Sequence, residues 1–155
     1  EIRLSGSEEV ALLCDRGWII EAVSNLVKNA LDHTETGDTV HIEWRAFASI
    51  VQITVRDNGC GIHPEDLYHI FKRFYRSRFS KDTQGLGLGL PLAKAIVEAH
   101  NGTIDVLFRN SGGLDITENC KGMYMTLMMA VPIFLDSDAG DSVLALTYDC
   151  CRIVS

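Results

Sequence analysis

The chain has 155 residues, of which 46% are hydrophobic and 23% are charged, and this composition is typical of one soluble globular domain. Its net charge of -7 excludes broad binding to nucleic acid, because such binding needs Lys and Arg to neutralise phosphates. The longest apolar run, residues 123–135, is shorter than the roughly 20 residues that a membrane span requires. We therefore expect a single domain that contacts neither nucleic acid nor a membrane.

The five cysteines of the chain show no metal-ligand spacing, and two of them are adjacent in sequence. This pattern indicates a reducing compartment rather than a framework of disulfides. Residues 1–15 also lack the apolar segment of a signal peptide. These features predict a cytoplasmic domain, and any segment that meets a membrane is expected outside this chain.

The first long element is predicted to be an amphipathic helix. Asp15 is placed to cap this helix, and its apolar residues recur on one arc until about His33. On the polar flank, Glu21, Asn25 and Asn29 follow one another at a spacing of four, so their side chains lie along one line. A solvated helix face has the same pattern.

Strands are predicted on both sides of this helix. A short buried strand covers residues 10–14, and two alternating apolar runs at 40–44 and 51–55 are expected to form an antiparallel hairpin. Pro64 is placed to begin a short helix that reaches Phe71.

The second half of the chain contains one more helix. Residues 76–84 are polar and basic without a regular period, which predicts a mobile loop. Gly89 is expected to open a helix that ends in a left-handed cap at Asn101 and Gly102. Two later strands are expected at residues 103–107 and 123–131. Residues 133–155 show no pattern that assigns a structure to them.

Two glycine clusters are suited to hold a nucleotide between them. Glycine at alternate positions from Gly85 to Leu90 suits neither a strand nor a helix, and indicates that backbone N–H groups approach a ligand closely. The helix that follows would place its positive end beneath a phosphate. In the other cluster, Asp57 can accept a hydrogen bond from an adenine amino group. Because the amide oxygens of Asn25 and Asn29 can hold a divalent ion, the chain predicts a site for ATP and Mg²⁺.

Each of these features also has an ordinary explanation when it is considered alone. Asp57, Asn58 and Gly59 form a common turn signal, and a basic patch is usually solvated. The basic residues between the glycine clusters are Arg73, Arg76, Arg78 and Lys81. His33 differs, because it continues the helix flank beside Asn29, where its ring can stack on a base.

Four motifs in this order resemble those of bacterial sensor histidine kinases. They are an asparagine box from Glu21 to Ala30, a first glycine box from Asp57 to Gly61, a phenylalanine box from Phe71 to Arg76 and a second glycine box from Gly85 to Leu90. The resemblance covers about residues 10–104 and extends more weakly to Pro132.

This resemblance implies the fold of the GHKL ATPase superfamily. That fold is an α/β two-layer sandwich of the Bergerat ATP-binding type, in which helices pack on one face of a mixed β-sheet. We expect this histidine kinase catalytic and ATP-binding domain to cover residues 1–132. Residues 133–155 would form a C-terminal tail of unassigned origin and structure.

The resemblance also implies roles for individual residues. Asn25 and Asn29 would hold Mg²⁺, Asp57 would read adenine, and Arg76 and Gln84 would reach the terminal phosphate. The implied nucleotide-binding residues are Asn25, Asn29, His33, Asp57, Gly59, Gly61, Arg76, Gln84, Gly85, Leu86, Gly87, Leu88 and Gly89. The implied catalytic residues are Glu21, Asn25 and Arg76, of which Glu21 matches the water-activating base of hydrolytic relatives.

The implied function is transfer of the γ-phosphoryl group of Mg-ATP to a histidine on a separate helical dimerisation domain. That phospho-acceptor domain and, indirectly, a response regulator would be the partners, and the parent protein would be anchored to a membrane. None of the five histidines lies in the setting expected of the acceptor, so the acceptor is expected elsewhere. The alternatives are a noncatalytic nucleotide-sensing module and an anti-sigma-type serine kinase or ATPase of the same superfamily.

Three features depart from the family pattern. Asp32 stands where many of these kinases have Lys, and His33 where many have Tyr, so we expect one phosphate contact fewer and weaker adenine stacking. Residues 120–123, Cys-Lys-Gly-Met, replace the usual Gly-x-Gly-Thr ending, which leaves the pairing of the last strands open.

Overall fold

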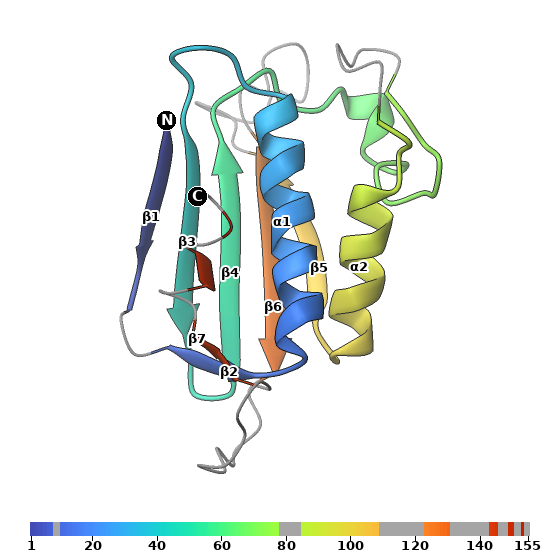
Figure 1. Cartoon of the computed structure of the whole chain (residues 1–155). Helices are drawn as coiled ribbons and strands as arrows, with labels where there is room; N and C mark the ends of the chain where they lie inside the picture. The colour runs from blue at the N-terminus through green and yellow to red at the C-terminus, as the bar shows by residue number, and fades with distance from the viewer. Residues whose placement is uncertain are drawn as a thin grey trace.

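The computed structural model describes residues 1–7, 10–77, 85–108, 123–130, 143–145, 149–150 and 153. Within these residues, helices α1 and α2 lie on one face of a five-stranded β-sheet (Figure 1). The elements in chain order are β1 (Ile2–Gly6), β2 (Ala11–Leu13), α1 (Arg16–Asp32), β3 (Val40–Ala46), β4 (Ile50–Asp57), the 3-10 helix η1 (Pro64–Asp66), α2 (Gly89–Ala99), β5 (Thr103–Phe108), β6 (Met123–Ala130) and β7 (Val143–Ala145). This arrangement confirms the predicted fold class.

The sheet is mixed, with its strands in the order β1-β3-β4-β6-β5. β1 runs parallel to β3, whereas the other three pairs of neighbours are antiparallel. The pairing of β3 with β4 is the predicted hairpin and sets Val40 opposite Asp57. The first glycine cluster, which follows β4, therefore begins beside the first residue of β3. β2 and β7 form a separate antiparallel pair.

α1 begins where the sequence predicts, because Asp15 caps it. The Asp15 carboxylate accepts a hydrogen bond from the Trp18 backbone N–H at 3.1 Å, a contact worth about 1 kcal/mol. The predicted apolar arc is buried in the core and consists of Ile19, Ala22, Val23, Leu26, Val27 and Ala30. Because burying one such Leu or Val contributes roughly 1.5–3 kcal/mol, packing fixes α1 and leaves its polar flank available to a ligand.

α2 packs beside α1 and ends in the predicted left-handed cap. Asn101 has a φ of 57°, its N–H donates to the Glu98 carbonyl at 3.1 Å, and the Gly102 N–H donates to the Val97 carbonyl at 2.9 Å. These two bonds define a Schellman motif, which satisfies the last carbonyls of the helix. The buried residues of α2 are Ala93, Ile96 and Val97.

Two elements differ from those predicted. β1 is an unpredicted edge strand, and its parallel pairing with β3 joins residues far apart in sequence, which no local pattern reveals. The prediction of one helix from Pro64 to Phe71 is wrong, since the 3-10 helix η1 ends at Asp66 and isolated turns follow it. Asp66 is buried and its carboxylate accepts a hydrogen bond from the Tyr75 hydroxyl, so the chain folds back instead of continuing as a helix.

Described residues near the C-terminus pack against the first elements of the chain. β7 pairs with β2. The buried Asp149 carboxylate accepts hydrogen bonds from Arg16 Nε at 3.1 and 3.2 Å, and a further one from Arg16 Nη2. Cys150 belongs to the hydrophobic core. These contacts tie the last part of the chain to the start of α1. The proposed division at residue 132 stays a prediction.

Candidate functional site

A cavity of about 720 Å³ lies between α1, the start of α2 and the connections that follow β4. Its volume is typical of ligand pockets, which measure about 300–1,000 Å³. The predicted site residues that line it are Asn25, Asn29, His33, Gly61, Arg76, Gly85, Leu86, Gly87, Leu88 and Gly89. Motifs that are separate in sequence therefore meet around one space.

The other predicted residues are placed differently. Glu21 does not line the cavity but contacts Asn25, which does. Asp57 and Gly59 are not among the lining residues, and Asp57 is only 4% exposed. Arg78, Lys81 and Gln84 lie outside the described residues, as do residues 120–122 of the motif at 120–123.

The α1 wall carries two charged side chains in addition to the predicted amides. Lys28 and Asp32 line the cavity together with Asn25 and Asn29. Spacings of three and four residues put all of these side chains on one helix face. Lys28 is absent from the predicted site. Its spacing of three residues from Asn25 already puts it on the same helix face, so the helical repeat could have identified it.

Hydrogen bonds fix the orientation of the Asn25 amide. Its Nδ2 donates to the Glu21 carbonyl at 2.9 Å and to the Glu21 carboxylate at 3.0 Å. Its Oδ1 faces the start of α2, since a Cβ placed on Gly89 would lie 2.9 Å from it. Glu21 therefore orients Asn25 so that an oxygen rather than a nitrogen is directed across the helix interface.

Asn29 has a donor that the described residues do not satisfy. Its Nδ2 is buried and has no hydrogen-bond partner within the described part of the chain. A buried donor left unsatisfied costs roughly 1–3 kcal/mol. Because Asn29 lines the cavity, an acceptor atom of a ligand can remove this cost, as a phosphate oxygen would.

The first glycine turn is docked on the C-terminal end of α1. The Gly59 N–H donates to the Asp57 carboxylate at 2.9 Å, and the Cys60 N–H donates to the His33 carbonyl at 3.1 Å. A side chain on Gly59 would overlap that same carbonyl oxygen. Glycine is therefore required here by the close approach of two backbones, and this approach holds Asp57 beside the end of α1.

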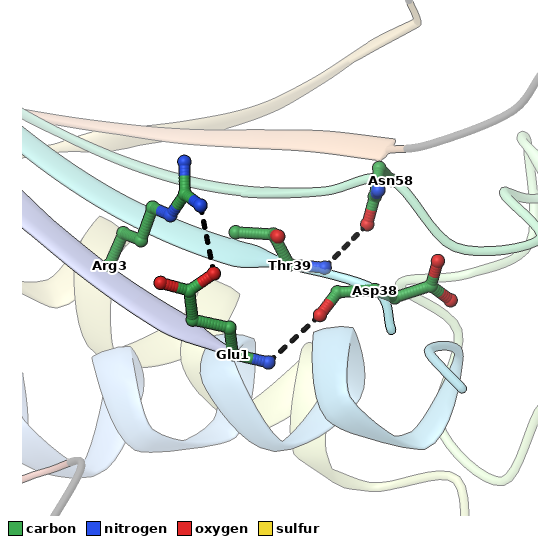
Figure 2. A network of polar contacts seen from close by, with 5 residues as sticks. All are labelled: Glu1, Arg3, Asp38, Thr39 and Asn58. Carbon is green, nitrogen blue, oxygen red and sulfur yellow. Dashed lines mark hydrogen bonds and ion pairs between the residues drawn. The ribbon is translucent and has the colours of Figure 1, made fainter. Parts of the chain in front are cut away.

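Figure 2 shows a polar network that fixes the same turn to the start of β3. The Asn58 side-chain carbonyl accepts a hydrogen bond from the Thr39 N–H at 2.6 Å. The backbone nitrogen of Glu1 donates to the Asp38 carbonyl at 2.8 Å, and Arg3 donates to the Glu1 carboxylate at 2.8 Å. The hydrogen bond from Arg3 lowers the pKa of the Glu1 carboxyl. Asn58, which is not among the predicted site residues, thus positions the first glycine turn.

The second glycine cluster is docked on the phenylalanine box. The Phe74 N–H donates to the Gly87 carbonyl at 3.0 Å. Gly87 has a φ of +67°, and a side chain there would overlap the carbonyl oxygen of Tyr75. Both the backbone angle and the close approach therefore require glycine at this position.

The N-terminal end of α2 faces the cavity. Leu88, Gly89 and Leu90 line the cavity, and the N-cap residue Leu88 makes no side-chain hydrogen bond to the first turn. The first N–H groups of a helix lack partners within the helix and attract anions. Lys28 and Arg76 add two cations to the cavity lining, so the lining suits a polyphosphate.

A magnesium ion fits this site through an amide oxygen. Within the described residues, no three His, Cys, Asp or Glu side chains are grouped so that they could hold a metal ion. Mg²⁺ bound with a nucleotide usually keeps waters and takes phosphate oxygens with few protein ligands. The directed Oδ1 of Asn25 supplies one suitable oxygen.

The chain belongs to the family of histidine kinase-, DNA gyrase B- and HSP90-like ATPases, whose sequence profile matches residues 14–132. The resemblance predicted from the four motifs is thereby confirmed. Membership of this ATPase family implies that the domain binds ATP.

Proteins with sequences similar to this chain include sensor histidine kinases. The chain is 36% identical over 115 residues to the sensor histidine kinase YvrG of Bacillus subtilis, a match that covers 74% of this chain and 20% of YvrG. It is 35% identical over 119 residues to the sensor-like histidine kinase SenX3 of Mycobacterium tuberculosis, covering 76% of this chain and 29% of SenX3. The chain thus spans less than a third of the length of these relatives.

Solved structures share the fold. The mycobacterial sensor histidine kinase MprB superposes with a TM-score of 0.70 at 23% identity, with 84% of both chains covered. Full-length ShkA in complex with AMPPNP gives a TM-score of 0.66 at 27% identity, with 85% of this chain and 26% of ShkA covered.

Across the described residues, no helix combines the length and apolar character needed to cross a membrane.

Proposed function

We propose that the chain is the ATP-binding catalytic domain of a two-component sensor histidine kinase that works in the cytoplasm. It transfers the γ-phosphoryl group of Mg-ATP to a histidine on a separate helical dimerisation domain of its parent protein, from which a response regulator receives it. The observation that carries this proposal is the meeting of the α1 amides, the glycine clusters and the start of α2 around one cavity. The similarity to sensor kinases supports it.

The adenine base is proposed to bind at the first glycine turn. Asp57 is buried there, and the Gly59 N–H fixes one oxygen of its carboxylate. A carboxylate accepts the hydrogen of an adenine amino group, whereas guanine presents a carbonyl oxygen at the corresponding position. His33 lines the cavity at the end of α1 and offers its ring for stacking.

The phosphates are proposed to lie between α1 and the start of α2. Backbone N–H groups of the second glycine cluster and of the first turn of α2 bind their oxygens. Asn25 and Asn29 would hold Mg²⁺ through their amide oxygens, and bound Mg²⁺ neutralises charge on the phosphates. Glu21 supports this arrangement by orienting the Asn25 amide.

Transfer requires positioning and charge stabilisation more than covalent chemistry by this domain. A nitrogen of the acceptor imidazole attacks the γ-phosphorus while the bond to the β–γ bridging oxygen breaks, and ADP leaves with the electron pair. Arg76 lines the cavity and is proposed to stabilise charge on the transferred group. Gln84 is proposed to act beside it.

A noncatalytic nucleotide-sensing module is a second candidate that one observation favours. Asp32 puts a carboxylate on the cavity wall, at a position where many sensor kinases have Lys. Like charges repel each other, which opposes a closely held triphosphate. Such a module would bind the nucleotide without transferring its terminal phosphoryl group.

The test combines this domain with the separately expressed helical domain of its parent kinase and γ-labelled ATP. A histidine kinase gives label on the acceptor that is lost in acid and retained in alkali. A sensing module gives no label although it binds ATP, and an anti-sigma-type serine kinase gives acid-stable label. An acceptor domain whose histidine is replaced by Gln is the matched control, and label on that control contradicts the proposed acceptor.

A further inference from the structure

A hydrogen bond between Tyr75 and Asp66 fixes the segment that follows η1. Tyr75 Oη donates to Asp66 Oδ1 at 2.5 Å, and both residues line the cavity. Asp66 is only 3% exposed. A buried carboxylate without sufficient donors is unfavourable, so this bond strongly favours the arrangement in which residue 75 lies against residue 66.

Backbone contacts fix the same segment from the other side. The Phe74 N–H donates to the Gly87 carbonyl at 3.0 Å, and the Tyr75 N–H donates to the Lys72 carbonyl at 3.2 Å. Phe74 has a φ of 61°, which a bulky residue adopts only where surrounding contacts hold it. Tyr75 is therefore held through both its backbone and its hydroxyl group.

The ring of Tyr75 packs on His69. The two ring centroids are 5.3 Å apart and the ring planes are tilted by 54°. Nδ1 of His69 is buried and has no hydrogen-bond partner among the residues described. His69 thus contributes a packing contact that restricts the Tyr75 ring to an orientation that reaches Asp66.

Arg76 follows Tyr75 directly and lines the cavity. Consecutive Cα atoms are a fixed distance of about 3.8 Å apart, so a displacement of residue 75 displaces residue 76. The interaction of a guanidinium with a phosphate weakens as their separation grows, and alignment of the two groups matters for paired hydrogen bonds. The place of Tyr75 therefore controls what Arg76 can contact.

We propose that Tyr75 is a positioning residue whose hydrogen bond to Asp66 places Arg76 against the terminal phosphate of a bound nucleotide. The inference rests on the proposed function, because Arg76 has this role only when the cavity holds Mg-ATP. Tyr75 acts through Arg76 and has no part in the transfer chemistry. Loss of its hydroxyl should therefore weaken binding of Mg-ATP more than binding of Mg-ADP, which lacks the terminal phosphate.

The test measures dissociation constants of Mg-ATP and Mg-ADP by calorimetry for the wild type and for Tyr75→Phe. Phenylalanine keeps the ring contact with His69, so the comparison isolates the hydroxyl group. We expect roughly tenfold weaker binding of Mg-ATP, equivalent to about 1.4 kcal/mol, and a much smaller change for Mg-ADP. An unchanged constant for Mg-ATP, or an equal loss for both nucleotides, overturns the proposal.

A double-mutant cycle separates positioning from damage to the fold. If Tyr75 acts through Arg76, Tyr75→Phe has no further effect on Mg-ATP binding once Arg76→Gln is present. Losses that add in the double variant overturn the proposal. Tyr68→Phe is the matched control, since Tyr68 is 88% exposed and does not line the cavity, and it should change neither constant.

The wild-type titration distinguishes failure of the proposed function from failure of the role proposed for Tyr75. A wild type that fails to bind Mg-ATP refutes the proposed function together with the role of Tyr75. A wild type that binds Mg-ATP, with a Tyr75→Phe variant that binds it equally well, refutes only the role of Tyr75.

Discussion

The two walls of the cavity are built in different ways. The α1 wall consists of side chains on a regular helix, whose positions follow from the helical repeat. The opposite wall consists mainly of turns and connecting segments, and contacts between residues distant in sequence hold it. Gly59 lies against the His33 carbonyl, and Phe74 donates to the Gly87 carbonyl. A change on α1 should therefore alter binding alone, whereas a change in a glycine turn should alter folding as well.

The largest effect is expected from Gly59→Ala. The new methyl group would overlap the His33 carbonyl oxygen, so the turn and the end of α1 must separate. Overpacking of this kind costs roughly 1–3 kcal/mol and occasionally more. We expect a lower free energy of unfolding in chemical denaturation and strongly weakened nucleotide binding, because Asp57 and Cys60 move with the turn.

Gly37→Ala is the matched control for this substitution. Gly37 has a φ of +101°, but a Cβ there meets nothing within 4 Å. Backbone strain alone, of about 1–3 kcal/mol, should lower stability while Mg-ATP binding to the folded protein is unchanged. If both variants bind Mg-ATP as the wild type does, the glycine turns are not part of the site.

The α1 wall is tested by Asn29→Ala, which should weaken Mg-ATP binding by about tenfold or more through loss of a hydrogen-bonding or metal-binding group. Alanine is a better helix former than asparagine, and the change also removes a buried unsatisfied donor. The free protein should therefore be as stable as the wild type or slightly more stable in thermal unfolding. Ser24→Ala, on the same helix but away from the cavity lining, is the control. Equal dissociation constants for Asn29→Ala and wild type would remove Asn29 from the site.

Base selection tests whether the first glycine turn reads adenine. If the Asp57 carboxylate accepts the adenine amino hydrogen, GTP leaves a buried acceptor unpaired at a cost of about 1–3 kcal/mol. Competition titrations should then show ATP preferred over GTP, and Asp57→Asn should reduce that preference. Indifference of the wild type to the base would exclude Asp57 from this role.

The smallest effect is expected at Asp32, where the α1 wall carries a charge of the same sign as the phosphates. Asp32 is exposed, so removing its charge should tighten Mg-ATP binding by less than about 1 kcal/mol, and added salt should diminish the gain. Asp32→Asn is compared with Asp32→Glu, which keeps the charge. Weaker binding by Asp32→Asn would show that the carboxylate assists the ligand instead.

The contrast between the walls also explains how much of the site the sequence predicts. The helix repeat and the Asp15 cap define α1, so the line from Glu21 to His33 follows from the amino-acid pattern alone. The glycine clusters are recognisable because glycine at alternate positions suits no regular element. Lys28 is missed only because a cation on a polar flank is ordinary.

Features that depend on single contacts between distant residues are not predicted. The bond from Tyr75 to Asp66 joins the segment after η1 back to η1, and no period in the sequence signals it. The same is true of the ion pair between Arg16 and Asp149, which joins the two ends of the chain. Such pairs form only once the intervening chain has folded, so the local secondary-structure propensity of the sequence does not predict them.

Thermal unfolding with and without Mg-ATP tests the central claim, that this cavity is a nucleotide site, most directly. A ligand that binds only the folded state stabilises it, by about 2.7 kcal/mol at a concentration one hundred times its dissociation constant. We predict that millimolar Mg-ATP raises the Tm of the wild type, and that the rise is much smaller for Asn29→Ala. A Tm that Mg-ATP leaves unmoved in the wild type would contradict the claim.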